Sequence, residues 1–136
     1  MNISVNQVQG RVPVAILGVE GDLDATNYQE LIAKATEIYR AGTRDILVDL
    51  SHTAFISSSG LVALHSIAVI LKGEQPPNLQ DGWSAIHTVG RGLGSGAQQH
   101  VKLLKPQPKV ERVLEKAGLK ELFEIYTDPA TAVASF

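Results

Sequence analysis

The chain has 136 residues, with 12 basic and 14 acidic side chains and a formal net charge of −2 at neutral pH. This length predicts one domain with a buried core, and the charge balance argues against binding to nucleic acid or to an anionic membrane surface. The absence of cysteine excludes disulfides and thiolate metal sites. With no signal-peptide pattern and no apolar run approaching ~20 residues, we expect a cytoplasmic protein outside the membrane.

The first part of the chain predicts two strands and a helix. Residues 3–8 alternate apolar and polar side chains imperfectly and predict a strand. Val12–Val19 is apolar on both faces, which is typical of an inner strand. Tyr28–Tyr39 has apolar residues at the 3, 4, 7 spacing of an amphipathic helix, with Asp24 as its expected N-cap and Gly42 at its C-cap.

A third strand completes a βαβ unit. Ile46–Leu50 is short, apolar and rich in β-branched residues, so it predicts a buried strand. A right-handed crossover makes this strand parallel to Val12–Val19, so that both strands end at the same edge of the sheet. We therefore expect the loops that follow them, Asp22–Asp24 and Ser57–Ser59, to be neighbours.

A serine-rich turn precedes the most apolar segment of the chain. Leu61–Leu71 contains no turn residue and predicts a helix that is mostly buried. Ser57, Ser58 and Ser59 precede it, and a serine there can cap the helix by accepting a hydrogen bond from a free backbone N–H group. Capping alone would explain the triplet. The same helix N-terminus would also stabilise a phosphate on one of these serines.

The segment Glu74–Gln99 differs from the rest in composition. Its prolines and alternating glycines predict a long surface loop with a short strand at Ser84–Val89. Gly90–Gly96 meets a loosened dinucleotide-binding pattern, but it lacks the strand and helix that such a loop joins, which favours a flexible linker. Trp83 is expected to cover a nearby apolar patch, and its exposure would instead suit a partner contact.

The C-terminal part predicts a strand, a helix, a strand and a short helix. The strands are expected at Val101–Leu104 and Phe123–Tyr126. The first helix is opened by Pro108 and ended at Gly118, and the last helix is Ala130–Phe136, capped by Asp128.

Several of these motifs together resemble one family. Three segments follow one another here: Asp49-Leu50-Ser51, Phe55-Ile56, and Ser58-Ser59-Gly60-Leu61, which opens an apolar helix. Together they resemble the signature of the STAS domain family, which includes bacterial anti-sigma factor antagonists. Gly21-Asp22-Leu23-Asp24 is similar to a turn that the family carries, and the C-terminal half is similar as well. The resemblance implies an α/β fold, a single STAS-like domain over residues 1–136. Its sheet would be mixed but mostly parallel, with four to five strands, about four helices and an insertion at about 74–99.

The resemblance also implies a site. In the family, an aspartate precedes two serines, and the first serine is phosphorylated by a partner kinase. Ser58 matches the acceptor, with Ser57 and Ser59 less favoured, and Ser57 stands where the family has aspartate. The implied partner is an anti-sigma factor that is also an ATP-using serine kinase. The residues expected to form the partner-binding edge are Asp22, Asp24, Ser57, Ser59 and Gly60.

Catalytic groups are sparse. The histidines, His52, His65, His87 and His100, show no metal-binding spacing, and no serine-hydrolase motif occurs. His52 is only a speculative base for Ser58, and His65 is expected to be packed in its helix. We therefore expect no enzyme, cofactor or bound metal. The oligomeric state stays open, with a homodimer among the alternatives.

Two further hypotheses remain open beside the phosphorylated antagonist. The first is a constitutive interaction or scaffold module in a signalling or transport assembly, in which Ser57 marks the loss of phosphorylation. The second is a nucleotide binder that uses Gly90–Gly96.

Overall fold

The computed structural model describes residues 2–71, 100–120 and 122–136, which form one α/β domain built on a five-stranded sheet. The strands are β1 (Asn2–Gln9), β2 (Pro13–Glu20), β3 (Asp45–Asp49), β4 (Val101–Leu104) and β5 (Ile125–Tyr126). They lie in the order β1-β2-β3-β4-β5; β1 is antiparallel to β2, and all other neighbours are parallel. The mixed, mostly parallel sheet expected from the sequence is thus confirmed.

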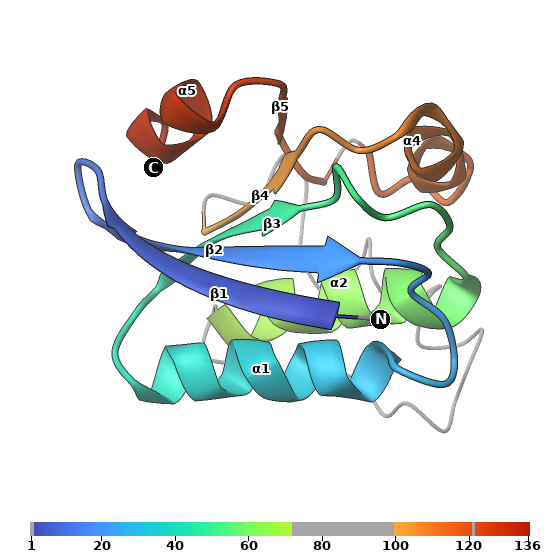
Figure 1. Ribbon diagram of the computed structural model, residues 1–136, viewed down its shortest axis with the longest axis horizontal. Helices are drawn as coiled ribbons and strands as arrows, with labels where there is room; N and C mark the ends of the chain where they lie inside the picture. Colours follow the sequence, from blue (N-terminus) through green and yellow to red (C-terminus); the bar gives the residue numbers. More distant parts are fainter. Residues whose placement is uncertain (1, 72–99, 121) are drawn as a thin grey trace.

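Four helices are described: α1 (Tyr28–Arg40), α2 (Ser58–Leu71), α4 (Pro108–Lys116) and α5 (Pro129–Ala134). Figure 1 shows α1 and α2 side by side beneath the sheet and α5 on the opposite face. The main core lies between the sheet and α1 and α2, and α4 adds its buried Val110 and Leu114 to that core. A second, smaller cluster joins Ala132 of α5 to Val14, Leu47 and Leu104.

The inner position of β2 follows from its two apolar faces. Ala15, Leu17 and Val19 are buried in the main core, whereas Val14 and Ile16 pack in the cluster beneath α5. The alternating direction of side chains along a strand separates the two sets. The prediction of an inner strand is confirmed, since β2 lies between β1 and β3.

Helix α2 is buried along nearly its whole length, as the sequence predicted. Every residue from Gly60 to Leu71 is buried. The helix begins at Ser58, three residues earlier than the apolar segment that predicted it. Apolar periodicity cannot locate a first turn made of serine and glycine, and here that turn carries the expected site.

The start of α1 corrects one prediction. Asp24 is not the N-cap; the helix begins at Tyr28 and its N-cap is Asn27. The Asp24 carboxylate accepts hydrogen bonds from the backbone N and the hydroxyl of Thr26, and its carbonyl accepts from Asn27 N. Asp24 therefore stabilises a separate turn just before the helix.

The final strand is shorter than predicted. Only Leu103–Ile125 and Leu104–Tyr126 pair, so Phe123 lies outside β5 although its side chain is buried. Phe123 therefore contributes to the core and not to the pairing of β5 with β4. The cap predicted for the last helix is confirmed, because the Asp128 carboxylate accepts a hydrogen bond from Thr131 N.

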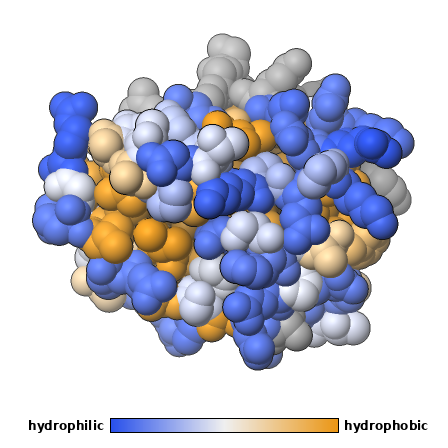
Figure 2. Space-filling view, turned by 45° about the horizontal axis from the view of Figure 1, so that its top comes forward, coloured by the Kyte–Doolittle hydropathy of each residue, from blue (hydrophilic) through white to orange (hydrophobic). Residues whose placement is uncertain are grey.

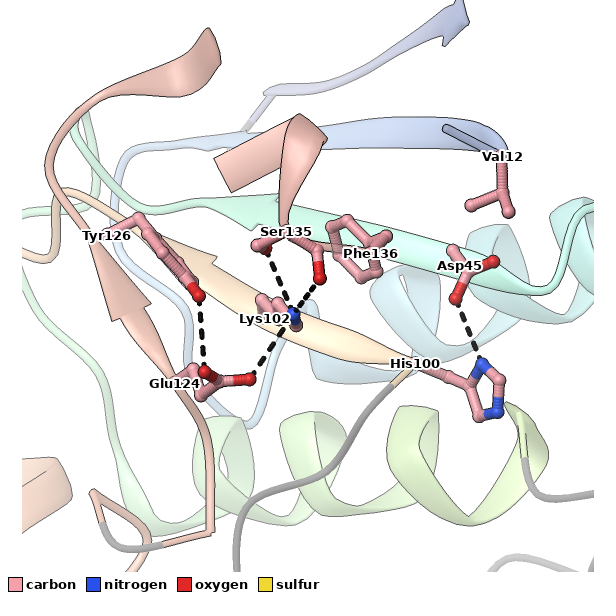
Figure 3. A pocket seen from close by; sticks show the side chains of 8 residues that line it. All are labelled: Val12, Asp45, His100, Lys102, Glu124, Tyr126, Ser135 and Phe136. Carbon is pink, nitrogen blue, oxygen red and sulfur yellow. Dashed lines mark hydrogen bonds and ion pairs between the residues drawn. The ribbon is translucent and has the colours of Figure 1, made fainter. Parts of the chain in front are cut away.

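A buried lysine holds the C-terminal segment on the sheet. Figure 3 shows Lys102 of β4 pointing toward Glu124 and the residues that follow α5. Its Nζ donates to the carbonyl and the hydroxyl oxygens of Ser135, at 2.9 Å each, and lies 3.2 Å from a Glu124 carboxylate oxygen. The Phe136 ring lies 4.8 Å from the same nitrogen. All three N–H donors of the ammonium can thus be matched, which offsets the cost of burying it.

Half-buried apolar side chains reach the surface on the face that carries α5. Figure 2 shows them at its left, among a mostly polar surface. An open groove of about 510 Å³ lies there between the β1–β2 turn and α5, lined among others by Val8, Ile16 and Val133. The segment 74–99, with Trp83, the strand predicted at 84–89 and the Gly90–Gly96 loop, lies outside the described residues. In the described parts of the chain, no helix is both long enough and apolar enough to cross a membrane.

Candidate functional site

The expected site forms where the connection from β2 to α1 meets the connection from β3 to α2. Leu23 N donates to the carbonyl of Phe55 at 2.9 Å, and Ser57 N donates to the carbonyl of Leu23 at 2.9 Å. Leu23 and Ile56 thereby form a short parallel bridge beyond the ends of the strands. The sequence prediction that these two loops are neighbours is confirmed, and both connections descend together at the right of Figure 1.

Further hydrogen bonds fix the β3–α2 connection. Gly21 N donates to the carbonyl of His52, and the buried Thr53 hydroxyl donates to the carbonyl of Val19 at 2.8 Å. At the start of the connection, the Asp49 carboxylate accepts from the backbone N and the hydroxyl of Ser51. These contacts hold the turn in one conformation, so that the start of α2 has a defined position.

The three serines occupy different environments. Ser57 caps the helix: its hydroxyl oxygen accepts a hydrogen bond from Gly60 N at 3.4 Å, and its carbonyl accepts from Leu61 N. Ser58 is exposed, whereas Ser57 and Ser59 are half-buried. Ser58 is therefore the most accessible residue of the triplet, and it lies in the first turn of a helix whose N–H groups and dipole favour negative charge.

Gly60 is buried directly beneath Leu23. A β-carbon on Gly60 would lie 2.6 Å from Ile56 Cγ1 and 2.9 Å from both Leu23 Cγ and the Leu23 carbonyl oxygen. No side chain fits at this point without moving backbone. The role expected for Gly60 in partner binding stays a prediction, and its position gives it a structural role as well.

The two acidic residues flank this junction differently. Asp22 is exposed, and its carbonyl accepts a hydrogen bond from the Asn27 side chain at 2.8 Å. Asp24 is half-buried, and the hydrogen bonds from Thr26 lower the pKa of its carboxyl. Asp22 and Asp24 thus flank Leu23, the residue that forms the bridge to Ile56.

One residue of this surface was not predicted as a site residue. Phe55 is 50 % exposed and lies between the bridge at Ile56 and the turn at Thr53. Its neighbour Ile56 is 1 % exposed, so the pair splits into one outward and one inward side chain. Adjacent residues of an extended segment point in opposite directions, so one of two neighbouring apolar residues must face outward. The sequence does not say which of Phe55 and Ile56 it is.

Two histidines considered in the sequence analysis, His52 and His65, have defined surroundings. Nδ1 of His52 lies 3.1 Å from the Ser51 hydroxyl, and among the described residues no hydrogen bond joins His52 to Ser58. His65 is buried in α2, in agreement with the prediction of a packed side chain. Among the residues that the structure describes, no three acidic or histidine side chains gather in a way that could hold a metal ion.

The sequence profile of the STAS domain matches residues 5–74, which is 70 of the 136 residues and includes every residue of this site. This chain belongs to the STAS domain family. No curated protein matches the sequence significantly.

Solved structures agree with the STAS fold. A Thermotoga maritima protein assigned as an anti-sigma factor antagonist is 20 % identical with a TM-score of 0.63, covering 96 % of this chain and 90 % of its own. An anti-sigma factor antagonist from Mycobacterium paratuberculosis is 18 % identical with a TM-score of 0.59, covering 97 % and 94 %. The Bacillus cell fate determinant SpoIIAA in its phosphorylated form is 15 % identical with a TM-score of 0.54, covering 96 % of each chain. At these identities the likeness supports the STAS fold alone.

Proposed function

We propose that this STAS domain is a regulatory binding module of the anti-sigma factor antagonist type. Its partner would be an anti-sigma factor that is also a serine kinase, and docking would release the sigma factor held by that partner. Solved structures of like fold are described as anti-sigma factor antagonists, and one of them is a phosphorylated form, which supports this assignment. The proposal gives the chain itself no catalytic role, so magnesium and ATP would belong to the kinase.

The observation that carries the proposal is the environment of Ser58. Ser58 is the one exposed residue of the three, and it lies in the first turn of a helix that is buried from Gly60 to Leu71. Phosphate there adds about −1.5 to −2 charge without displacing a core residue. The helix N-terminus stabilises that charge, so the fold tolerates the modification.

The surroundings of Ser58 explain how phosphate would act as a switch. Asp22 is exposed on the neighbouring loop, and the half-exposed Phe55, whose carbonyl accepts from Leu23 N, offers an apolar contact next to that loop. A partner that docks here must desolvate this surface, and a dianion at its edge opposes both desolvation and any acidic group of the partner. Phosphorylation would therefore weaken docking without any change of fold.

Ser57 favours a second candidate function. It stands where the family has aspartate, and a kinase that reads this carboxylate would not recognise the chain. The alternative is a constitutive STAS interaction module, whose docking is the same for Ser58→Ala and Ser58→Asp.

Peptide mass spectrometry of the protein purified from its native host tests the proposal. We expect a phosphate mass increase on the peptide that contains Ser58, its loss in Ser58→Ala, and its retention in the matched variant Ser59→Ala. Copurification of a host anti-sigma factor with Ser58→Ala, but not with Ser58→Asp, would support the switch. An unmodified protein that binds the same partner in both variants would contradict it and favour the constitutive module.

A further inference from the structure

The two edges of the sheet are very different. β5 contributes two residues to one edge, and β1 contributes eight to the other. Short strands, charged side chains and proline are the usual protection of an edge against pairing with another chain. β1 reads Asn-Ile-Ser-Val-Asn-Gln-Val-Gln, with neither a charge nor a proline, and Figure 1 shows it outermost at the front of the sheet.

The free backbone groups of this edge can be assigned. Gly10 N donates to the carbonyl of Val12, and the register pairs Val8 with Val14 in the same ladder. Because hydrogen-bonded and non-bonded pairs alternate in an antiparallel ladder, the even-numbered residues of β1 bond to β2. The N–H and C=O groups of the odd-numbered residues therefore point to the open edge. These residues are Ile3, Val5, Gln7 and Gln9.

Val5 lies in the middle of this edge. It is 38 % exposed and, with Phe55, is one of two large apolar side chains that the described residues leave exposed. It points to the same face of the sheet as Ile3, which packs against the main core. A strand added beside β1 would cover Val5 and satisfy the backbone groups at once.

Charge at the two ends of the β1–β2 hairpin sets the direction of pairing. Arg11 is exposed in the turn at one end, and at the other end Glu20, which is opposite Asn2, and Asp22 are exposed. Two hairpins placed edge to edge in antiparallel direction bring the basic end of each beside the acidic end of the other. An uncharged strand adds no like-charge repulsion to this arrangement.

We propose that β1 pairs with β1 of a second copy of this chain, antiparallel and about a two-fold axis at Val5. The sheet then continues from one copy into the other, and the same surface serves both copies, as a closed two-fold interface requires. In this register Val5 faces Val5 of the second copy, and Ile3 faces Gln7 of the second copy. The pairing residues of β1 do not include Ser58, and only Asp22, at the acidic end of the hairpin, belongs to both surfaces. The test of the pairing does not depend on phosphorylation.

Disulfide trapping tests the register. Directly opposed residues of a hydrogen-bonded antiparallel pair have Cα atoms about 5.5 Å apart, within the range that a disulfide spans. The chain has no cysteine, so Val5→Cys introduces a single thiol per copy. We expect this variant to form a covalent dimer under mild oxidation. Gln7→Cys is the matched control on the same face, since its two copies lie four residues apart along the strands, about 13 Å, and cannot be bridged.

The mass in solution tests the pairing itself. We expect sedimentation or light scattering to give twice the monomer mass for the wild-type chain at high concentration, and the monomer mass for Val5→Lys. Val5 is exposed, so the lysine leaves the fold intact, which an unchanged circular dichroism spectrum would verify. A wild-type chain that stays monomeric up to its solubility limit would overturn the proposal. An edge that binds an extended peptide of another protein in place of a second copy would give this result too. Cross-linking of Gln7→Cys in place of Val5→Cys would overturn the register.

Discussion

Gly60 of α2 and Leu23 of the β2–α1 loop approach so closely that a β-carbon on the glycine would lie 2.9 Å from the leucine carbonyl oxygen. That oxygen is also the acceptor for Ser57 N, so it cannot move without breaking the bond that joins the two loops. The glycine thus permits the junction beside which Ser58 is presented.

Gly60→Ala is therefore expected to destabilise the protein. Alanine has the better helix propensity, so a gain in stability would follow if the helix alone mattered. Because the added methyl meets backbone and two buried side chains, we expect a loss of about 1–3 kcal/mol. Urea unfolding measures it, with Ser59→Ala in the same turn as the control that leaves the midpoint nearly unchanged. An unchanged or raised midpoint for Gly60→Ala would contradict the close packing.

The sequence predicted this junction in part. Two parallel strands that end at one edge were enough to place the Asp22–Asp24 and Ser57–Ser59 loops together. The roles of individual residues depend on contacts between segments distant in sequence. Asp24 fits an N-cap by composition, and only the bonds from Thr26 show that it stabilises a different turn.

Similar limits apply to the burial of single side chains. Lys102 lies in an otherwise apolar four-residue strand. The sequence of that strand does not predict that Ser135, thirty-three residues later, accepts hydrogen bonds from the lysine. The exposure of Phe55 likewise follows from the bridge at Ile56, which local sequence does not reveal. Strand and helix types follow from periodicity, whereas these side chains are placed by tertiary contacts.

Lys102→Met is expected to loosen the C-terminal segment. The substitution keeps the apolar stem but leaves the Ser135 oxygens without their donor and Glu124 without its ion-pair partner. We expect a loss of about 1.5–3 kcal/mol, the usual contribution of hydrogen bonds that involve a charged group. Hydrogen exchange should speed up first in residues 129–136.

Lys120→Met is the matched control for Lys102→Met. Lys120 also forms an ion pair, with Glu111 at 3.0 Å, but both side chains are about two-fifths exposed. Exposed pairs contribute little, so this variant should unfold like the wild type. Equal effects of the two variants would show that the buried position of Lys102 does not matter.

His65 is expected to make the fold sensitive to mild acid. Burial lowers the pKa of this histidine from 6.5 to about 4. Among the described residues, its Nδ1 has no hydrogen-bond partner. The unfolded chain therefore binds a proton between pH 6.5 and about 4 while the folded chain does not. Stability should be complete above pH 6.5 and fall on acidification through this window, by at most about 1.4 kcal/mol per pH unit.

His65→Gln separates this effect from the other titrations. The variant should lose the slope between pH 6.5 and 4, whatever its stability at neutral pH. His52→Gln, at an exposed position, should keep the slope. Asp24 and Asp128, whose carboxyl pKa values are lowered by hydrogen bonds from Thr26 and Thr131, lose their contribution only at pH values below about 4. A wild-type slope that survives in His65→Gln would assign the acid sensitivity to another group.

Ser57→Asp is expected to strengthen the cap of α2 and to restore the carboxylate of the family pattern. The Ser57 hydroxyl holds Gly60 N at 3.4 Å, a long bond, so Ser57→Ala should cost an amount near the lower end of about 0.5–2 kcal/mol. A carboxylate at the same position accepts more strongly and interacts favourably with the helix dipole, so the aspartate variant should melt above the wild type. If a kinase modifies Ser58, the firmer turn and the restored carboxylate should also raise the rate of phosphorylation.

Ser59→Asp distinguishes capping from charge alone. It places the same carboxylate in the first turn of α2, where it meets the dipole but is not at the cap position. Thermal melts of the two variants side by side should show the larger gain for Ser57→Asp, and phosphorylation should rise in that variant alone. Equal gains would mean that Ser57 contributes no specific cap. A lower melting temperature for Ser57→Asp would mean that nearby Asp22 and Asp24 repel the new charge more strongly than the helix N-terminus attracts it.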